Sequence, residues 1–332
     1  MKKVDECVAC ASKQIINFKA FISPFIAERI WGNNISDINL SWCKNCDFAF
    51  YNPRLEENEA RVLYKNYRDK DYQQQRYKHE PYYTSKINDL IGNNETEIAN
   101  RKANLFRILN KNIDISEIKN ILDFGGDKGQ FIIDEAADAN KFVFEISGVK
   151  PLDNIVKLNN YNECKKHSYD LIMCCHVLEH VPYPSEIIQN IKDLSNKNTV
   201  LYIEIPLEFP FVYDNLSRFK KIIRSISFLN PFLSNLEEAF NKRKALLIDN
   251  QDDLKNSGYI NKIFSDIPKY INKILSLSRF YMNEHINFFT PKSLEKILEI
   301  NGFDNISTEI KEIDCGWINY KAICCLAKIS NK

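Results

Sequence analysis

The stretch NILDFGGDKGQF at residues 120–131 decides the fold. An apolar lead into Asp123 is typical of a buried strand, and three of the nine glycines in the chain, Gly125, Gly126 and Gly129, follow within five positions. Glycines crowded in this way indicate a turn whose backbone approaches a ligand closely. The spacing fits neither the G-x-G-x-x-G pattern nor the G-x-x-x-x-G-K-[ST] phosphate loop. We therefore expect a strand, a ligand-binding turn and then the N-terminus of a helix.

Strand-like and helix-like segments alternate on both sides of this turn. Such alternation predicts repeated β–α units and a parallel, doubly wound sheet with right-handed crossovers. Ile98, Leu105, Ile108 and Leu109 share one face of a further amphipathic helix upstream. The expected strands are 118–124, 141–147, 170–178, 199–206, 306–313 and 320–329, and the expected helices are 95–111, 129–139, 185–194 and one starting at Pro291.

Charged side chains follow the expected strands where α/β proteins bind ligands, at the carboxyl edge of the sheet. Glu145 comes 22 residues after Asp123, at the end of the second strand, which is the position of a ribose-binding carboxylate. In a rival register the second strand ends at Lys150, and a lysine is a poor acceptor for two hydroxyls. A later apolar strand delivers His176 and His180 to the same edge.

These motifs resemble those of the class I S-adenosylmethionine (SAM) methyltransferases. The glycine turn is similar to their D-x-G-x-G-x-G motif, although Asp127 replaces the middle glycine. The segment YDLIMCCHVLEHVPYP at 169–184 matches their fourth strand and its sequel at Asp170, Val177, Leu178, Glu179, His180, Val181 and Pro184. The resemblance implies a Rossmann-like class I methyltransferase fold, with SAM contacted by Asp123, Gly125, Gly126, Gly129, Glu145 and His176.

Two C-x-x-C pairs near the N-terminus predict a metal site. Cys7, Cys10, Cys43 and Cys46 can supply four thiolates to a structural zinc ion, which would substitute for a core too small to fold alone. A disulfide or free thiols are the alternatives. The string CKNCDFAFYNPRL at 43–55 resembles the zinc-binding domain of a methyltransferase family that includes sugar C-methyltransferases.

A second histidine motif, FYMNEHINFFTPKSL at 280–294, resembles the Glu-His motif of the same family. There the motif implies a position over the substrate. We expect His285 or His180 to act as the base, Glu284 to orient or assist it, and Tyr281 to donate a hydrogen bond to a substrate oxygen. A histidine with a near-neutral pKa suits removal of a proton from a hydroxyl or from a carbon beside a ketone.

The composition limits the class of partner. Forty-five basic and 44 acidic residues give a net charge of +1, so no overall field favours nucleic acid. No signal-like or 18-residue apolar run occurs, which predicts a cytoplasmic protein. The segment 218–236 is basic and amphipathic, which suits a lid, an interface helix or peripheral membrane contact.

The sequence predicts one function and an organisation in five parts. The predicted function is methylation of a nucleotide-linked sugar on carbon or oxygen, in polysaccharide or secondary-metabolite biosynthesis. The alternatives are a nicotinamide-dependent sugar oxidoreductase and a methyltransferase acting on RNA or another small molecule. The parts are a zinc-binding domain at 1–60, a helical cover at 61–115, a SAM-binding core at 116–206, a helical insertion at 207–281 and the remainder of the core at 282–332.

Overall fold

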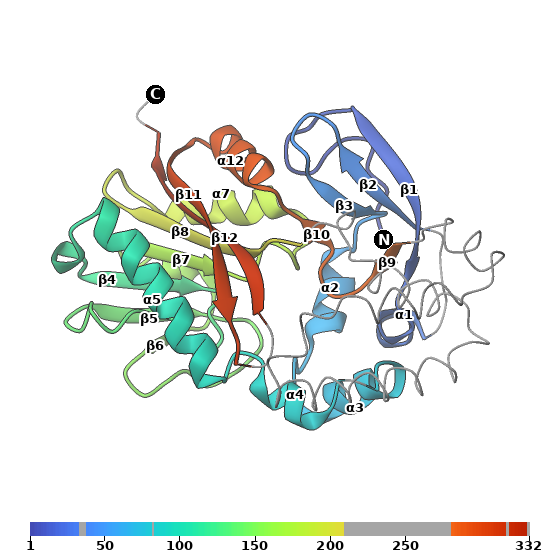
Figure 1. Cartoon of the computed structure of the whole chain (residues 1–332), viewed down its shortest axis with the longest axis horizontal. Helices are drawn as coiled ribbons and strands as arrows, with labels where there is room; N and C mark the ends of the chain where they lie inside the picture. Colours follow the sequence, from blue (N-terminus) through green and yellow to red (C-terminus); the bar gives the residue numbers. More distant parts are fainter. Residues whose placement is uncertain (33–37, 82, 209–279, 317–318, 331–332) are drawn as a thin grey trace, which may run out of the picture.

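The computed structural model describes residues 1–32, 38–81, 83–208, 280–316 and 319–330. Two β-sheets organise them, and Figure 1 shows the sheets side by side, with a run of short helices passing below both. The expected insertion at 207–281, including the basic segment 218–236, lies almost wholly outside the described residues. Among the helices that are described, none is long and apolar enough to cross a membrane.

The larger sheet has seven strands in the order β11-β12-β8-β7-β4-β5-β6. The five strands from β8 to β6 run parallel, and β12 returns antiparallel against β8 to form a hairpin with β11. The chain winds outward in both directions from β4, so the predicted doubly wound class I methyltransferase fold is confirmed. The strands are β4 Asn120–Phe124, β5 Asn140–Phe144, β6 Val156–Leu158, β7 Leu171–Cys175, β8 Val200–Pro206, β11 Phe303–Asp314 and β12 Asn319–Ile329.

Burial explains why β4 and β7 occupy the centre. Every residue of β7 and β8, and all but the first of β4, is buried, as expected for parallel strands that helices cover on both faces. Asp123 pairs in register with Val143 on one side and Met173 on the other. The switch point between β4 and β7 therefore lies directly at the glycine turn, where doubly wound sheets bind ligands.

The expected helix at 129–139 is wrong. Turns and bends connect Gly129 to β5, and Phe131, Ile132 and Ile133 are all buried. Three consecutive residues of a helix point over an arc of about 200°, which is wider than one packed face of a surface helix. The burial of all three thus favours an irregular connection pressed into the core.

The smaller sheet combines the N-terminal strands with two strands from residues 280–288, in the order β10-β3-β2-β1-β9. Residues 280–288, which the sequence analysis divided between the insertion and the core, instead add β9 and β10 to the two edges of the N-terminal strands. Pairing satisfies backbone groups that an edge strand would otherwise leave open. The elements are β1 Ile15–Ile22, α1 Pro24–Trp31, β2 Ile38–Cys43, β3 Ala49–Asn52, β9 Phe280–Met282 and β10 Asn287–Phe288.

Helices cover the larger sheet and bridge to the smaller one (Figure 1). The predicted amphipathic helix is confirmed as α5, which buries Leu105, Ile108 and Leu109. Thr290 caps α12 and Pro291 begins it, as expected. The helices are α2 Glu57–Tyr64, α3 Lys70–His79, α4 Ser85–Leu90, α5 Glu95–Asn112, α6 Tyr161–Cys164, α7 Pro184–Leu194 and α12 Pro291–Ile300, with a 3₁₀ turn, η1, at Ile115–Glu117.

Candidate active site

The glycine turn leaves β4 in a conformation that other residues would strain. Gly125 and Gly129 both have φ of +74°, in the left-handed region that favours glycine. A Cβ on Gly125 would lie 2.6 Å from Val177, and one on Gly126 would lie 2.1 Å from the carboxyl carbon of Asp123. The turn therefore packs directly on the start of the predicted histidine segment and around the Asp123 side chain.

Asp123 is the buried end of β4. It is 0% exposed, and neither carboxylate oxygen has a hydrogen-bond partner among the residues that the structure describes. Burial raises its pKa to about 7, with Arg101 acting in the opposite direction. A buried acid that is unpaired and has a strongly raised pKa is a candidate for a ligand site.

Glu145 follows β5 at the same edge of the sheet. Its Oε2 accepts a hydrogen bond from the Asp127 amide at 3.2 Å, and its Oε1 accepts one from the Ser147 amide at 2.7 Å. The carboxylate is thus held beside the glycine turn, as the sequence spacing suggested. Lys150, the rival, is exposed and pairs with Asp153.

His176 directly follows β7 and has φ of +57°. Its Nδ1 lies 3.3 Å from Glu179 and its Nε2 lies 3.2 Å from both Glu204 and the Tyr320 hydroxyl. Burial and Arg101 lower the pKa of His176, but the two carboxylates raise it above its ordinary value overall. Because both ring nitrogens face protein groups, its contact with a cofactor stays a prediction.

His180 is held as a neutral imidazole. Its Nδ1 lies 3.2 Å from the Glu284 carbonyl oxygen, which can only accept, and 3.0 Å from the Tyr64 hydroxyl, which itself donates to that carbonyl. The proton therefore sits on Nδ1, and Nε2 carries a free lone pair. Burial, helped by the charge of His285, lowers the pKa of His180 to about 4, below the near-neutral value that the sequence analysis expected of the base.

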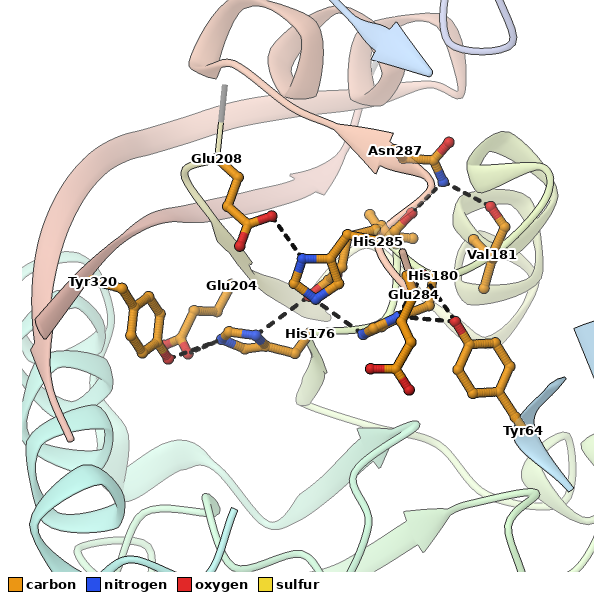
Figure 2. Close-up of polar contacts among 12 residues, drawn as sticks. Tyr64, His176, His180, Val181, Glu204, Glu208, Glu284, His285, Asn287 and Tyr320 are labelled. Atoms are coloured by element: carbon orange, nitrogen blue, oxygen red, sulfur yellow. Dashed lines mark hydrogen bonds and ion pairs between the residues drawn. The ribbon is translucent and has the colours of Figure 1, made fainter. Parts of the chain in front are cut away.

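His285 has the opposite charge state. Burial acts to lower the pKa of His285, but the Glu208 carboxylate, 2.7 Å from Nδ1, acts more strongly in the opposite direction. The net pKa is about 9. Figure 2 shows the two rings side by side, with Glu208 beyond His285 and Tyr64 beyond His180; their centroids are 4.7 Å apart. A neutral and a protonated imidazole in contact form an acid–base pair, since each environment pushes its pKa in a different direction.

Glu179 and Glu284 flank the histidine pair. Glu179 is 1% exposed, lies 3.9 Å from Nε2 of His180, and its carbonyl accepts the Ile286 amide at 2.9 Å. Glu284 forms an ion pair with Arg76 at 2.5 Å. The hydrogen bond from Ile286 to Glu179 attaches the Glu-His motif to the segment that follows β7. Of Tyr281 the structure describes the backbone, in β9, and not the side chain, so its proposed role stays a prediction.

One arginine joins the loops that carry these groups. Arg54 is 1% exposed and donates to the carbonyls of Pro182, Tyr51 and Ile286 at 2.7–3.2 Å, and to the Asn287 side chain at 2.6 Å. These acceptors belong to the segment after His180, to β3 and to the segment after His285. Arg54 therefore positions both histidines through backbone contacts.

The glycine turn and the histidine pair thus share one edge of the sheet. A family model described as a methyltransferase domain matches residues 76–308, which is more than half of the chain. The chain belongs to the methyltransferase-domain family. A search of curated proteins finds no match to this methyltransferase-domain chain.

Solved structures resemble this methyltransferase-domain protein weakly. Human N-acetylserotonin methyltransferase in complex with SAM shares 14% identity at a TM-score of 0.39, over 77% of this chain and 58% of that one. A SAM-dependent methyltransferase from Anabaena variabilis shares 11% at 0.40, over 73% and 90%. Magnesium protoporphyrin IX methyltransferase from Synechocystis, with bound S-adenosylhomocysteine, shares 14% at 0.38, over 71% and 84%. The chain spans about three fifths of the human enzyme and of the mitomycin 7-O-methyltransferase MmcR, 58% and 60% respectively.

The cysteine pairs of the methyltransferase-domain protein form two matching knuckles. The amides of Ala11 and Asp47 donate to the carbonyls of Cys7 and Cys43 at 2.8 and 2.9 Å, and both donors have positive φ. Sulfur atoms of the two knuckles lie 3.6 Å apart for Cys10–Cys43, and all four sulfurs lie within 4.8 Å of one another. A tetrahedral zinc ion with bonds of about 2.3 Å separates its ligands by about 3.8 Å, so the cluster fits that ion.

Another three-residue group could hold a metal by distance alone. Atoms of Glu179, His180 and His285 also lie within 4.8 Å of one another. In the metal-free protein the Glu208 carboxylate raises the pKa of His285 to about 9, which favours the protonated ring. We therefore interpret this group as proton-transfer machinery.

The sequence analysis missed several residues that hold this site, including Arg54, Glu204 and Tyr320 as well as the four that follow. Glu179 stands inside the quoted histidine motif, so its position between two histidines could have been expected. Tyr64, Arg76 and Glu208 come from segments without a recognisable pattern, and only the folded chain brings them to the histidines.

Proposed function

We propose that this protein transfers a methyl group from SAM to a carbon or oxygen of a sugar, and that the sugar is nucleotide-linked. The observation that supports this most directly is the contact between the glycine turn and the segment leading to His180. Gly125 packs on Val177, three residues before a histidine whose Nε2 is free to accept a proton. A methyl donor on the turn and an acceptor at the histidines would then be neighbours.

The residues at the turn fit SAM. The unpaired, buried carboxylate of Asp123 offers an acceptor at the turn, and Glu145 would accept the ribose hydroxyls. When bound, SAM supplies an electrophilic methyl group on a sulfonium. The absence of a side chain at Gly126 leaves the space that the Asp123 carboxyl group occupies.

The histidine pair would handle the proton of the acceptor. His180 Nε2 takes the proton from the hydroxyl, or from the carbon beside a ketone, as the new bond to the methyl carbon forms and the carbon–sulfur bond breaks. Glu179, 3.9 Å away, stabilises the resulting imidazolium. Protonated His285 donates to the acceptor oxygen and stabilises its negative charge. Of the two candidate bases, this favours His180.

The sugar assignment depends on the resemblance of the cysteine knuckles and the Glu-His motif to sugar C-methyltransferases. Membership of the methyltransferase-domain family removes the nicotinamide-dependent oxidoreductase. An RNA acceptor is disfavoured by the net charge of +1. A non-sugar small molecule is the alternative that the test must separate.

The test is a transfer assay with SAM carrying a labelled methyl group, run against a panel of nucleotide sugars, free sugars and aromatic hydroxyl compounds. His180→Gln should lower kcat by about 10²–10⁴-fold, the usual contribution of a general base. The control is His167→Gln, because His167 is exposed, packs on Phe142 and precedes β7, whereas His176 and His180 follow that strand at its other end. Labelling of only non-sugar compounds would refute the sugar as the substrate. Full turnover by His180→Gln would refute His180 as the base.

We also propose that the cysteine knuckles hold one structural zinc ion. Purified protein should contain one zinc per chain, and Cys43→Ser should lose the metal and unfold the smaller sheet. His285→Gln should retain one equivalent. Loss of metal from His285→Gln would instead make the histidine group a metal site.

A further inference from the structure

Arg68 occupies a constrained turn between α2 and α3. Its φ is +64°, and that of Asn66 is +52°, both in the region that disfavours ordinary side chains. Its carbonyl accepts the Asn88 side chain at 3.0 Å, and its Nη1 donates to the Ile91 carbonyl at 2.9 Å. Hydrogen bonds thus hold both the backbone and the side chain of Arg68. Residues with strained backbone conformations are common at functional sites.

The turn places the Arg68 guanidinium against the glycine loop. Gln130 donates to the Gly92 carbonyl at 2.9 Å, and Lys128 donates to Asn93 at 2.7 Å, so residues 92–93 are bound to the loop after β4. A Cβ on Gly92 would lie 3.0 Å from Arg68 Nη1 and 3.8 Å from an Asp127 oxygen. Arg68 therefore lies beside the part of the loop that follows Gly126.

Two tyrosines connect Arg68 to the histidine pair. Its guanidinium lies 4.7 Å from the centroid of the Tyr67 ring, Tyr67 packs on Tyr64 with ring centroids 5.6 Å apart, and the Tyr64 hydroxyl lies 3.0 Å from Nδ1 of His180. Burial raises the pKa of Glu284, and the charges of His285, Arg68 and Arg29 act to lower it. Arg68 thus stands between the glycine loop and the histidine pair. Tyr67 and the Ile91 carbonyl occupy part of the guanidinium, and its buried Nε has no hydrogen-bond partner among the described residues.

We propose that Arg68 binds the α-carboxylate of the methionine moiety of SAM. The inference rests on the proposed methyltransferase function. A ligand with its ribose at Glu145 and its methyl facing His180 extends its amino-acid end over the glycine loop, toward Arg68. The carboxylate is the only anionic group of SAM, and a guanidinium offers paired N–H donors that match it.

If Arg68 binds the carboxylate, its replacement should weaken only ligands that carry that group. S-adenosylhomocysteine has the carboxylate, whereas 5′-methylthioadenosine has the same nucleoside and thioether without the amino-acid end. Calorimetry on the full chain should show that Arg68→Met weakens S-adenosylhomocysteine binding by about 10–100-fold, the range for a hydrogen-bonded charge. Binding of 5′-methylthioadenosine should change by less than about twofold. Arg68→Lys, which retains the charge, should fall between the wild type and Arg68→Met.

The control is Arg61→Met, which removes a 70% exposed arginine paired with Glu57 in α2 and should leave both affinities unchanged. Equal losses for both ligands in Arg68→Met and Arg68→Lys would show that Arg68 only supports the loop, and would overturn the inference. Unchanged S-adenosylhomocysteine affinity would overturn it as well. A wild type that binds neither ligand would overturn the proposed function along with it.

Discussion

Replacing Asp123 with asparagine should stabilise the ligand-free protein at alkaline pH and weaken its affinity for SAM. The carboxyl group is fully buried, and neither oxygen has a partner among the residues described. Burial raises its pKa from 3.8 to about 7. An asparagine of the same shape removes the charge and keeps polar atoms at the turn.

The magnitude follows from linkage between proton binding and folding. Between pH 4 and pH 7 the folded protein holds a proton on Asp123 that the unfolded chain has released, so stability falls as the pH rises. Each pKa unit corresponds to about 1.4 kcal/mol, and a rise of about three units gives an upper limit of about 4 kcal/mol above pH 7. We expect Asp123→Asn to recover about 2–4 kcal/mol at pH 8, or about 4–8 °C in Tm.

The assay is thermal unfolding at pH 5 and pH 8, with and without S-adenosylhomocysteine. The gain should be small at pH 5 and large at pH 8, and the ligand should raise the Tm of the variant less than that of the wild type. Asp153→Asn is the control, because the side chain of Asp153 is 99% exposed. A variant less stable than the wild type at pH 8, or a gain equal at both pH values, would refute the reasoning.

Three further predictions concern the loops around the site. Arg54→Met should cost about 3–5 kcal/mol, because it leaves buried carbonyls without donors, whereas exposed Arg61→Met should cost less than about 0.5 kcal/mol by chemical denaturation; equal costs would contradict the bridging role. Gly125→Ala should fold but bind S-adenosylhomocysteine at least about tenfold more weakly in calorimetry, since φ is +74° and its Cβ would lie 2.6 Å from a neighbouring side chain; undiminished affinity would contradict this. The pKa of His285 is raised to about 9, so its pair with Glu208 adds stability that is present below about pH 6.5 and lost as the pH rises through 9. Glu208→Gln should therefore lower Tm at pH 6 and leave it unchanged at pH 10, and an equal deficit at both would exclude the pair as the cause.

Local sequence accounts for much of the core sheet. Strands β4, β7 and β8 were predictable because each is an apolar run bounded by turn residues, and burial on both faces allows little else. The periodicity at 95–111 and the Thr-Pro start of α12 were equally sufficient. The prediction of a helix at 129–139 was wrong. The apolar residues of this segment are buried by neighbours from elsewhere in the fold, and the local sequence pattern does not specify those neighbours.

What the sequence alone determined is the set of short-range signals: the glycine turn with Asp123 and Glu145, two cysteine knuckles and the histidine motifs, since each depends on residues close together in the chain. Tertiary structure decided the pairing of residues 280–288 with the N-terminal strands, and with it the approach of His285 to His180. It also decided their protonation. Charge on an imidazole depends on burial and on partners such as Glu208 and Tyr64, which lie 77 and 116 positions away, and no local pattern encodes those distances.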